Sequence, residues 1–143
     1  MITSSQQSHH PMLTPAQYTW VTGYHLEAHT LTCIGEQPPS SESGTHHALY
    51  QMHPAIGAVF HIHNIALWHD LIDRHRWHTS PTIPYGTAAM AVEVAQIYGA
   101  IADPFSRSVL AMGGHQDGVL SFGRTCDDAG SSLLALWNQA YSS

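Results

Sequence analysis

A short apolar run that ends in two histidines constrains the fold of this chain more than any other feature. Ile56–His63 is too short for a typical helix and has the composition of a buried strand. Asn64 follows it directly and can cap a helix. Apolar residues then recur at helical spacing, at Ile65, Trp68, Leu71 and Ile72. The sequence therefore predicts a buried strand followed at once by an amphipathic helix.

Strand and helix patterns alternate along the rest of the chain. A hairpin is expected over Tyr18–Tyr24 and Thr30–Ile34, because these segments are rich in β-branched and aromatic residues. Further strands are expected over 108–112 and 119–122, and further helices over 46–53, 88–101 and from 125 onward. Such alternation favours a layered α/β domain over a helix bundle or a β-sandwich. At 143 residues the chain is the size of one domain, 1–143, in which 1–12 are expected to form a flexible arm.

Lysine is absent and thirteen histidines are present. The lack of lysine excludes Schiff-base chemistry, pyridoxal-phosphate enzymes and a Walker-type phosphate lysine. A net charge of -6 argues against a nucleic-acid binder. Because imidazole binds metals when it is neutral, the chemistry of this chain is expected to reside in its histidines.

The cysteines indicate a reducing compartment. Cys33 and Cys126 lie far apart and form no C-x-x-C motif. The start of the chain lacks the pattern of a leader, and no stretch is apolar enough to span a membrane. The expectation is a soluble cytoplasmic protein with neither a membrane nor a nucleic-acid partner.

His61 and His63 stand two residues apart on the predicted strand. Side chains at i and i+2 of a strand project from one face, so both imidazoles can reach one ion, while Phe60 and Ile62 face the other way. A transition metal such as zinc suits this geometry. With thirteen histidines in 143 residues, however, about one H-x-H pair is expected by chance.

A third ligand and a carboxylate are available elsewhere in the sequence. His115 lies in a turn where Gly113 and Gly114 let the backbone approach other elements closely, although a turn histidine can equally be solvent-exposed. Glu42 is expected in the first turn of a helix that Pro54 ends. There it can serve a site or simply complement the helix dipole.

Several motifs, taken in order, resemble the class II aldolase/adducin family. They are Pro39-Ser40-Ser41-Glu42 with His46 and Tyr50, then Ala58–Asn64, Pro84–Thr87 and Leu110–His115. The resemblance, which covers about Leu13 to Trp137, implies a three-layer α/β/α sandwich with a mixed or largely antiparallel central sheet. It also implies a homo-oligomer, a cyclic tetramer, with sites near subunit interfaces.

The same resemblance implies a function and its residues. Zn²⁺ or another divalent transition metal would be held by His61, His63 and His115. Glu42 would be a further ligand in the resting state and the catalytic proton carrier during turnover, and Ser40 and Ser41 are candidate substrate-binding residues. The expected activity is that of an aldolase-like lyase that cleaves a small hydroxy-carbonyl or sugar-type substrate through an enediolate, whose charge a metal ion can neutralise.

Departures from the family pattern leave an alternative open. The phosphate-binding loop of the sugar-phosphate aldolases has no counterpart in the sequence, and there are few basic residues to replace it. Phosphorylated substrates are therefore disfavoured. The alternative functions are a non-catalytic metal-binding or interaction module of the adducin type, and a domain that folds without the metal.

Overall fold

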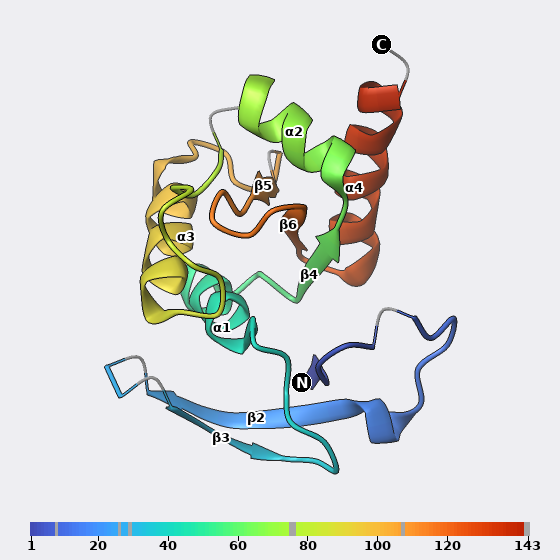
Figure 1. The fold of residues 1–143 in the computed structure, drawn as a ribbon, viewed down its shortest axis with the longest axis vertical. Helices are drawn as coiled ribbons and strands as arrows, with labels where there is room; N and C mark the ends of the chain where they lie inside the picture. Colours follow the sequence, from blue (N-terminus) through green and yellow to red (C-terminus); the bar gives the residue numbers. More distant parts are fainter. Residues whose placement is uncertain (8, 26, 29, 75–76, 107, 142–143) are drawn as a thin grey trace.

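Two three-stranded antiparallel sheets and four α-helices are seen in the computed structural model, among the residues that it describes, 1–7, 9–25, 27–28, 30–74, 77–106 and 108–141 (Figure 1). The strands are β1 (Ile2–Thr3), β2 (Tyr18–His25), β3 (Thr30–Ile34), β4 (Ala58–His63), β5 (Val109–Ala111) and β6 (Gly118–Gly123). The helices are α1 (Ser43–Met52), α2 (Ile65–Arg74), α3 (Ala88–Ala100) and α4 (Cys126–Tyr141), with a 3-10 turn at Pro15–Gln17. The predicted α/β class and the predicted strands and helices are confirmed.

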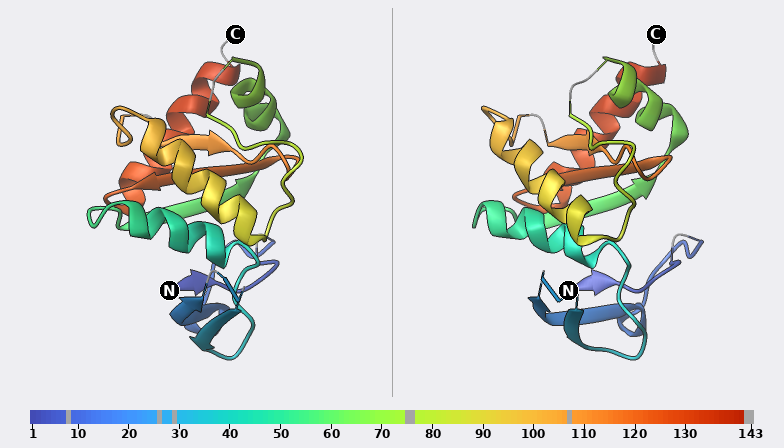
Figure 2. Two further views of the ribbon diagram at one scale, coloured as in Figure 1. Left: turned by 90° about the vertical axis from the view of Figure 1, so that its left-hand side faces the viewer. Right: turned by 60° about the vertical axis from the view of Figure 1, so that its left-hand side comes forward.

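The sheet β4-β6-β5 is covered by helices on both faces (Figure 2). On one face, Leu120 and Phe122 of β6 pack with buried residues of α1 and α3 such as Leu49 and Val94. On the other face, Val119 packs with buried residues of α2 and α4. Neighbouring residues of β6 thus enter different cores, as the alternation of a strand requires.

The sheet β1-β2-β3 lies apart from the other sheet, below α1 in Figure 1. It contains the expected hairpin, with Trp20 opposite Ile34 and His25 opposite Thr30. Its third strand comes from the segment for which an arm was expected, because Ile2–Thr3 pairs with β2. Ser4, the next residue, is buried. The resemblance implied a central sheet, and the described residues form a second sheet beside β4-β6-β5, made of the hairpin and β1.

Side-chain caps begin three of the helices where the sequence placed them. Asn64 accepts a hydrogen bond from the backbone N–H of Leu67 at 2.9 Å, and Thr87 accepts one from Met90 at 3.2 Å. Thr125 and Asp128 satisfy each other's backbone N–H groups, both at 3.1 Å. In α1 the outcome differs slightly. Glu42 is the N-cap residue rather than part of the first turn, because its backbone dihedral angles, φ -83° and ψ 9°, are not helical; its N–H donates a hydrogen bond to the Ser40 hydroxyl at 3.2 Å.

Cys33 and Cys126 are free and exposed. Within the described part of the chain, no helix combines the length and apolar character that crossing a membrane requires.

The core predicts a large cost for truncating Leu120. Its side chain is fully buried between α1 and α3, so Leu120→Ala removes packed methyl groups and leaves a cavity. We expect a loss of about 2–5 kcal/mol in the free energy of unfolding, measured by urea denaturation. Leu134→Ala is the matched control, because Leu134 is 65% exposed on α4 and should change stability little. Equal losses in both variants would contradict the assigned core.

Candidate metal centre

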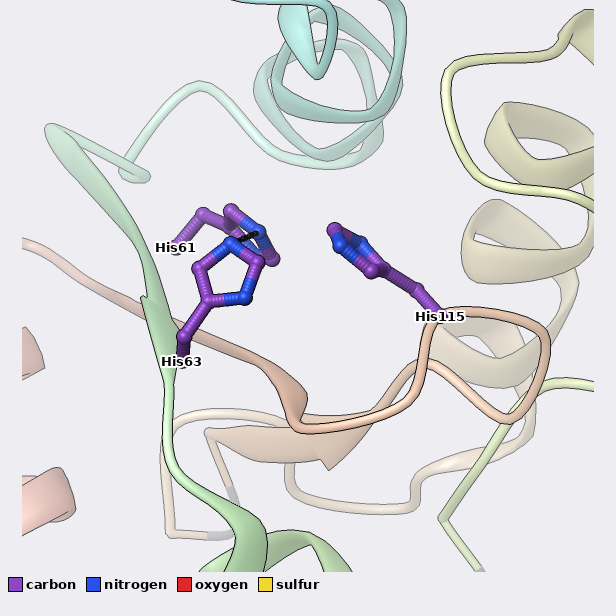
Figure 3. A group of neighbouring side chains, drawn as sticks. All are labelled: His61, His63 and His115. Atoms are coloured by element: carbon purple, nitrogen blue, oxygen red, sulfur yellow. Dashed lines mark hydrogen bonds between the residues drawn. The ribbon is translucent and has the colours of Figure 1, made fainter. Parts of the chain in front are cut away.

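Three imidazoles converge at one end of the sheet β4-β6-β5 (Figure 3). His61 and His63 project from β4, and His115 comes from the turn between β5 and β6. One ring nitrogen from each lies within 4.8 Å of the others. The Nε2 atoms of His61 and His63 are 3.1 Å apart. The structure thus brings together all three histidines that the sequence proposed as ligands.

Strand register places His61 and His63, and two glycines place His115. In the ladder, His61 pairs with Leu120 and His63 with Gly118, next to the turn that carries His115. A Cβ atom on Gly113 would collide with the carbonyl oxygen of Thr79, and one on Gly114 with that of Ile83. Only glycine allows the turn to pack this closely against the 79–83 loop.

Two neighbours hold the imidazoles in place. The Nδ1 atom of His63 lies 2.6 Å from a carboxylate oxygen of Asp117. The ring of Tyr85 stacks on that of His115, with 4.2 Å between centroids and 22° between planes. Neither neighbour was predicted from the sequence to be part of the site. Asp117 stands two residues after His115, but only the folded turn shows that it reaches His63.

Burial keeps the imidazoles of His61 and His115 neutral. Burial, followed by the other imidazoles His115, His63 and His46, lowers the pKa of His61 to about 3. Burial and then His63 lower the pKa of His115, while Asp117 opposes the shift. A neutral imidazole has a free lone pair, which is the form that binds a metal.

The donor set fits a divalent transition ion. Tetrahedral zinc with Zn–N bonds of about 2.0–2.1 Å places neighbouring ligand nitrogens roughly 3.3 Å apart. The Nε2 atoms of His61 and His63, at 3.1 Å, are close to that separation, and the three donor nitrogens lie within 4.8 Å of one another. Three imidazoles would leave a fourth coordination position for another ligand, as in catalytic rather than structural zinc sites.

Glu42 is a buried carboxylate beside this cluster. Only 1% of the residue is exposed. Its Oε2 accepts a hydrogen bond from the Thr45 hydroxyl at 2.8 Å, whereas Oε1 is buried and has no hydrogen-bond partner among the described residues. Burial raises the pKa of Glu42, and Thr45, the Gly86 backbone and the His63 imidazole partly offset that rise. The carboxyl group is therefore a stronger base than an exposed glutamate.

The cluster and Glu42 line one cavity of about 1410 Å³. Its other lining residues include Ser40, Ser41 and Tyr85, as well as residues from the first strand. Ser41 is exposed, whereas the half-buried Ser40 is engaged with Glu42 through its hydroxyl group. Both serines therefore lie at the cavity, and a role for either in binding a substrate remains a proposal.

The comparison with protein families agrees with the motifs. The family described as Class II Aldolase and Adducin N-terminal domain matches residues 2–140, nearly the whole chain. A comparison with curated proteins finds no match.

The three-histidine cluster predicts one divalent ion per chain. Elemental analysis of protein purified without a histidine tag and reconstituted with zinc should find one equivalent. The double variant His61→Ala/His63→Ala should lose it, because one remaining imidazole cannot hold the ion. His25→Ala/His69→Ala removes two exposed histidines outside the cluster and should keep the ion. Zinc retained by the first variant would contradict the site.

Buried histidines also predict an acid-sensitive fold for the metal-free protein. Burial, followed by the chain's amino terminus, lowers the pKa of His46 to about 4, and the pKa of His61 is about 3. The unfolded chain takes up protons near pH 6.5 while the folded chain resists them, so stability falls as the pH drops below 6.5. The loss should reach at most about 1.4 kcal/mol per pH unit for each group.

Urea unfolding at pH 7, 6 and 5 measures this loss. His46→Gln should make the pH dependence shallower, because it removes one of the histidines whose pKa burial lowers. The same pH dependence of the free energy of unfolding in the wild type and in His46→Gln would refute the prediction.

Proposed function

We propose that this chain, which belongs to the class II aldolase and adducin family, is a metal-dependent, aldolase-like lyase. Its substrate would be a small hydroxy-carbonyl or sugar-type compound. The reaction would cleave the carbon–carbon bond of a β-hydroxy carbonyl compound into two carbonyl products. Zinc or another divalent transition metal would be its cofactor, held by His61, His63 and His115.

One observation carries the proposal: the buried carboxyl group of Glu42, which has one oxygen without a hydrogen-bond partner among the described residues, lines the same cavity as the three imidazoles. Burying Glu42 costs free energy, and one hydrogen bond from Thr45 satisfies only half of its carboxyl group. A purely structural metal site needs no base beside it. A buried base next to potential ligands is instead typical of an active site.

Each residue has a distinct part in the proposed reaction. A bound divalent ion would supply Lewis-acid stabilisation of the negative charge that develops on the substrate's carbonyl oxygen. Glu42, through Oε1, would take the proton of the substrate's β-hydroxyl group as the carbon–carbon bond breaks. It would then return that proton to the carbon that has become nucleophilic.

The cavity lining favours an uncharged substrate. Its described lining residues offer hydroxyl, amide and imidazole groups, from residues such as Ser41, Gln7 and His63, but no arginine. A phosphate dianion is normally held by basic side chains or by several backbone N–H groups. Hydroxyl and imidazole groups are instead suited to the hydroxyls of a neutral polyol.

Three further expectations are part of the proposal. The helices on both faces of β4-β6-β5 support a three-layer α/β/α sandwich. The exposed, paired side chains of Trp20 and Ile34 support a homo-oligomer, with a tetramer as its expected form. The free cysteines support a cytoplasmic location.

Replacing Glu42 tests the proposed reaction. Glu42→Gln keeps the shape and the hydrogen-bonding capacity of the side chain but removes the base. We expect the rate of retro-aldol cleavage by zinc-loaded protein to fall roughly 10²–10⁴-fold over a panel of unphosphorylated hydroxy-carbonyl compounds. Glu36→Gln, at an exposed position, is the control and should retain full activity.

Two results would contradict the proposal. One is an unchanged rate in Glu42→Gln. The other is a wild-type protein that binds zinc but cleaves no member of the panel, with or without phosphate, faster than free zinc. The second result would identify the domain as a metal-binding module of the adducin type.

A further inference from the structure

We propose that Asp117 is a positioning residue for the metal centre: its carboxylate orients the His63 imidazole so that Nε2 points at the ion. This inference rests on the proposed metal site but not on the proposed reaction. It concerns a residue outside the three-histidine cluster. The contacts of Asp117, its backbone conformation and its exposure together support it.

The first support is the pair of contacts that the His63 ring makes. Nδ1 lies 2.6 Å from Oδ1 of Asp117, and Nε2 lies 3.1 Å from Nε2 of His61. An ionised carboxylate can only accept a hydrogen bond, so the proton of a neutral His63 ring is on Nδ1. The lone pair is then on Nε2, the atom that faces the other imidazoles. Asp117 thereby selects the tautomer that can bind a metal through Nε2.

The second support is that the backbone holds Asp117 in place. Its φ is 66°, in the left-handed region that residues with a side chain rarely adopt. Its carbonyl oxygen accepts the N–H of Asn64, the residue after His63, at 2.8 Å. Asn64 in turn caps α2 through its side chain. Asp117 is thus tied to the end of β4 by one backbone contact and one side-chain contact.

The third support is that the fold itself gains little from the pair. The side chains of His63 and Asp117 are 51% and 40% exposed. A pair this exposed to solvent contributes little to stability, and the left-handed backbone conformation opposes it. The short hydrogen bond between Asp117 and His63 is better explained by its effect on the orientation of the His63 imidazole.

The fourth support comes from the other two ligands. The Nδ1 atoms of His61 and His115 are buried and have no hydrogen-bond partner in the described part of the chain. Both residues are half-buried, and the ring of Tyr85 stacks on that of His115. His63 is the exposed member of the three and the one with a carboxylate partner. For His63, the carboxylate of Asp117 fixes the ring orientation that neighbouring side chains restrict for the other two histidines.

Two substitutions separate this role from a structural one. Asp117→Gly removes the carboxylate and suits the positive φ, so it should not impair folding. Asp117→Asn keeps an acceptor oxygen and also tolerates positive φ. Asp127→Asn removes one negative charge from the exposed start of α4 and is the control.

Zinc affinity, measured by competition with a chromogenic chelator, is the main readout. We expect Asp117→Gly to raise the Kd for zinc roughly 10–100-fold, as loss of a carboxylate partner of a ligand histidine typically does. Asp117→Asn should raise it less, and Asp127→Asn should leave it unchanged. Thermal unfolding of the metal-free variants checks that each one folds.

The tautomer of His63 is the second readout. Long-range ¹H–¹⁵N correlation spectra of the metal-free wild type should show His63 protonated on Nδ1, and Asp117→Gly should shift it towards a mixture. An unchanged zinc Kd in folded Asp117→Gly, or His63 protonated on Nε2 in the wild type, would overturn the inference. A wild type that binds zinc without cleaving any substrate would overturn the proposed function and leave this inference standing.

Discussion

The antiparallel register of β4 and β6 is the constraint on which the whole centre depends. It pairs His61 with Leu120 and His63 with Gly118, so both imidazoles lie on the face of the sheet that α1 and α3 cover. The same register brings the end of β4 beside the turn that carries His115. A shift of the pairing register by one residue would turn the imidazoles of His61 and His63 towards α2 and α4 and separate them from His115.

The centre is a continuation of one core. Along β4, Val59 packs into the cluster that α1 and α3 share, and His61 and His63 continue the same face towards the cavity. Burial therefore shifts the pKa of both groups: it lowers the pKa of the His61 imidazole and raises the pKa of the Glu42 carboxyl group. Both shifts favour neutral forms. The desolvation that stabilises the core also prepares neutral ligands and a basic carboxyl group.

Local patterns predicted the elements, but not how distant segments meet. Asn64, Thr87 and Pro54 mark helix boundaries through short-range chemistry, and the H-x-H spacing gives the shared face of two histidines directly. The split into two sheets depends on pairing between residues such as Ile2 and Thr19, which no local pattern encodes. The place of Asp117 was missed for the same reason, since its partner His63 lies 54 residues away.

A gradient of exposure across the centre explains its unequal parts. Glu42 is almost fully buried and His61 half-buried, so their neighbours hold them in position and desolvation adjusts their protonation. The His63 side chain is exposed to solvent, so packing restrains its ring only weakly. Fixing the ring in the one orientation that binds the ion therefore costs conformational entropy. A carboxylate at 2.6 Å limits that freedom before any ion arrives. A ligand on the solvent-exposed side of a partly buried site therefore needs a hydrogen-bond partner to fix its orientation, and Asp117 is that partner for His63.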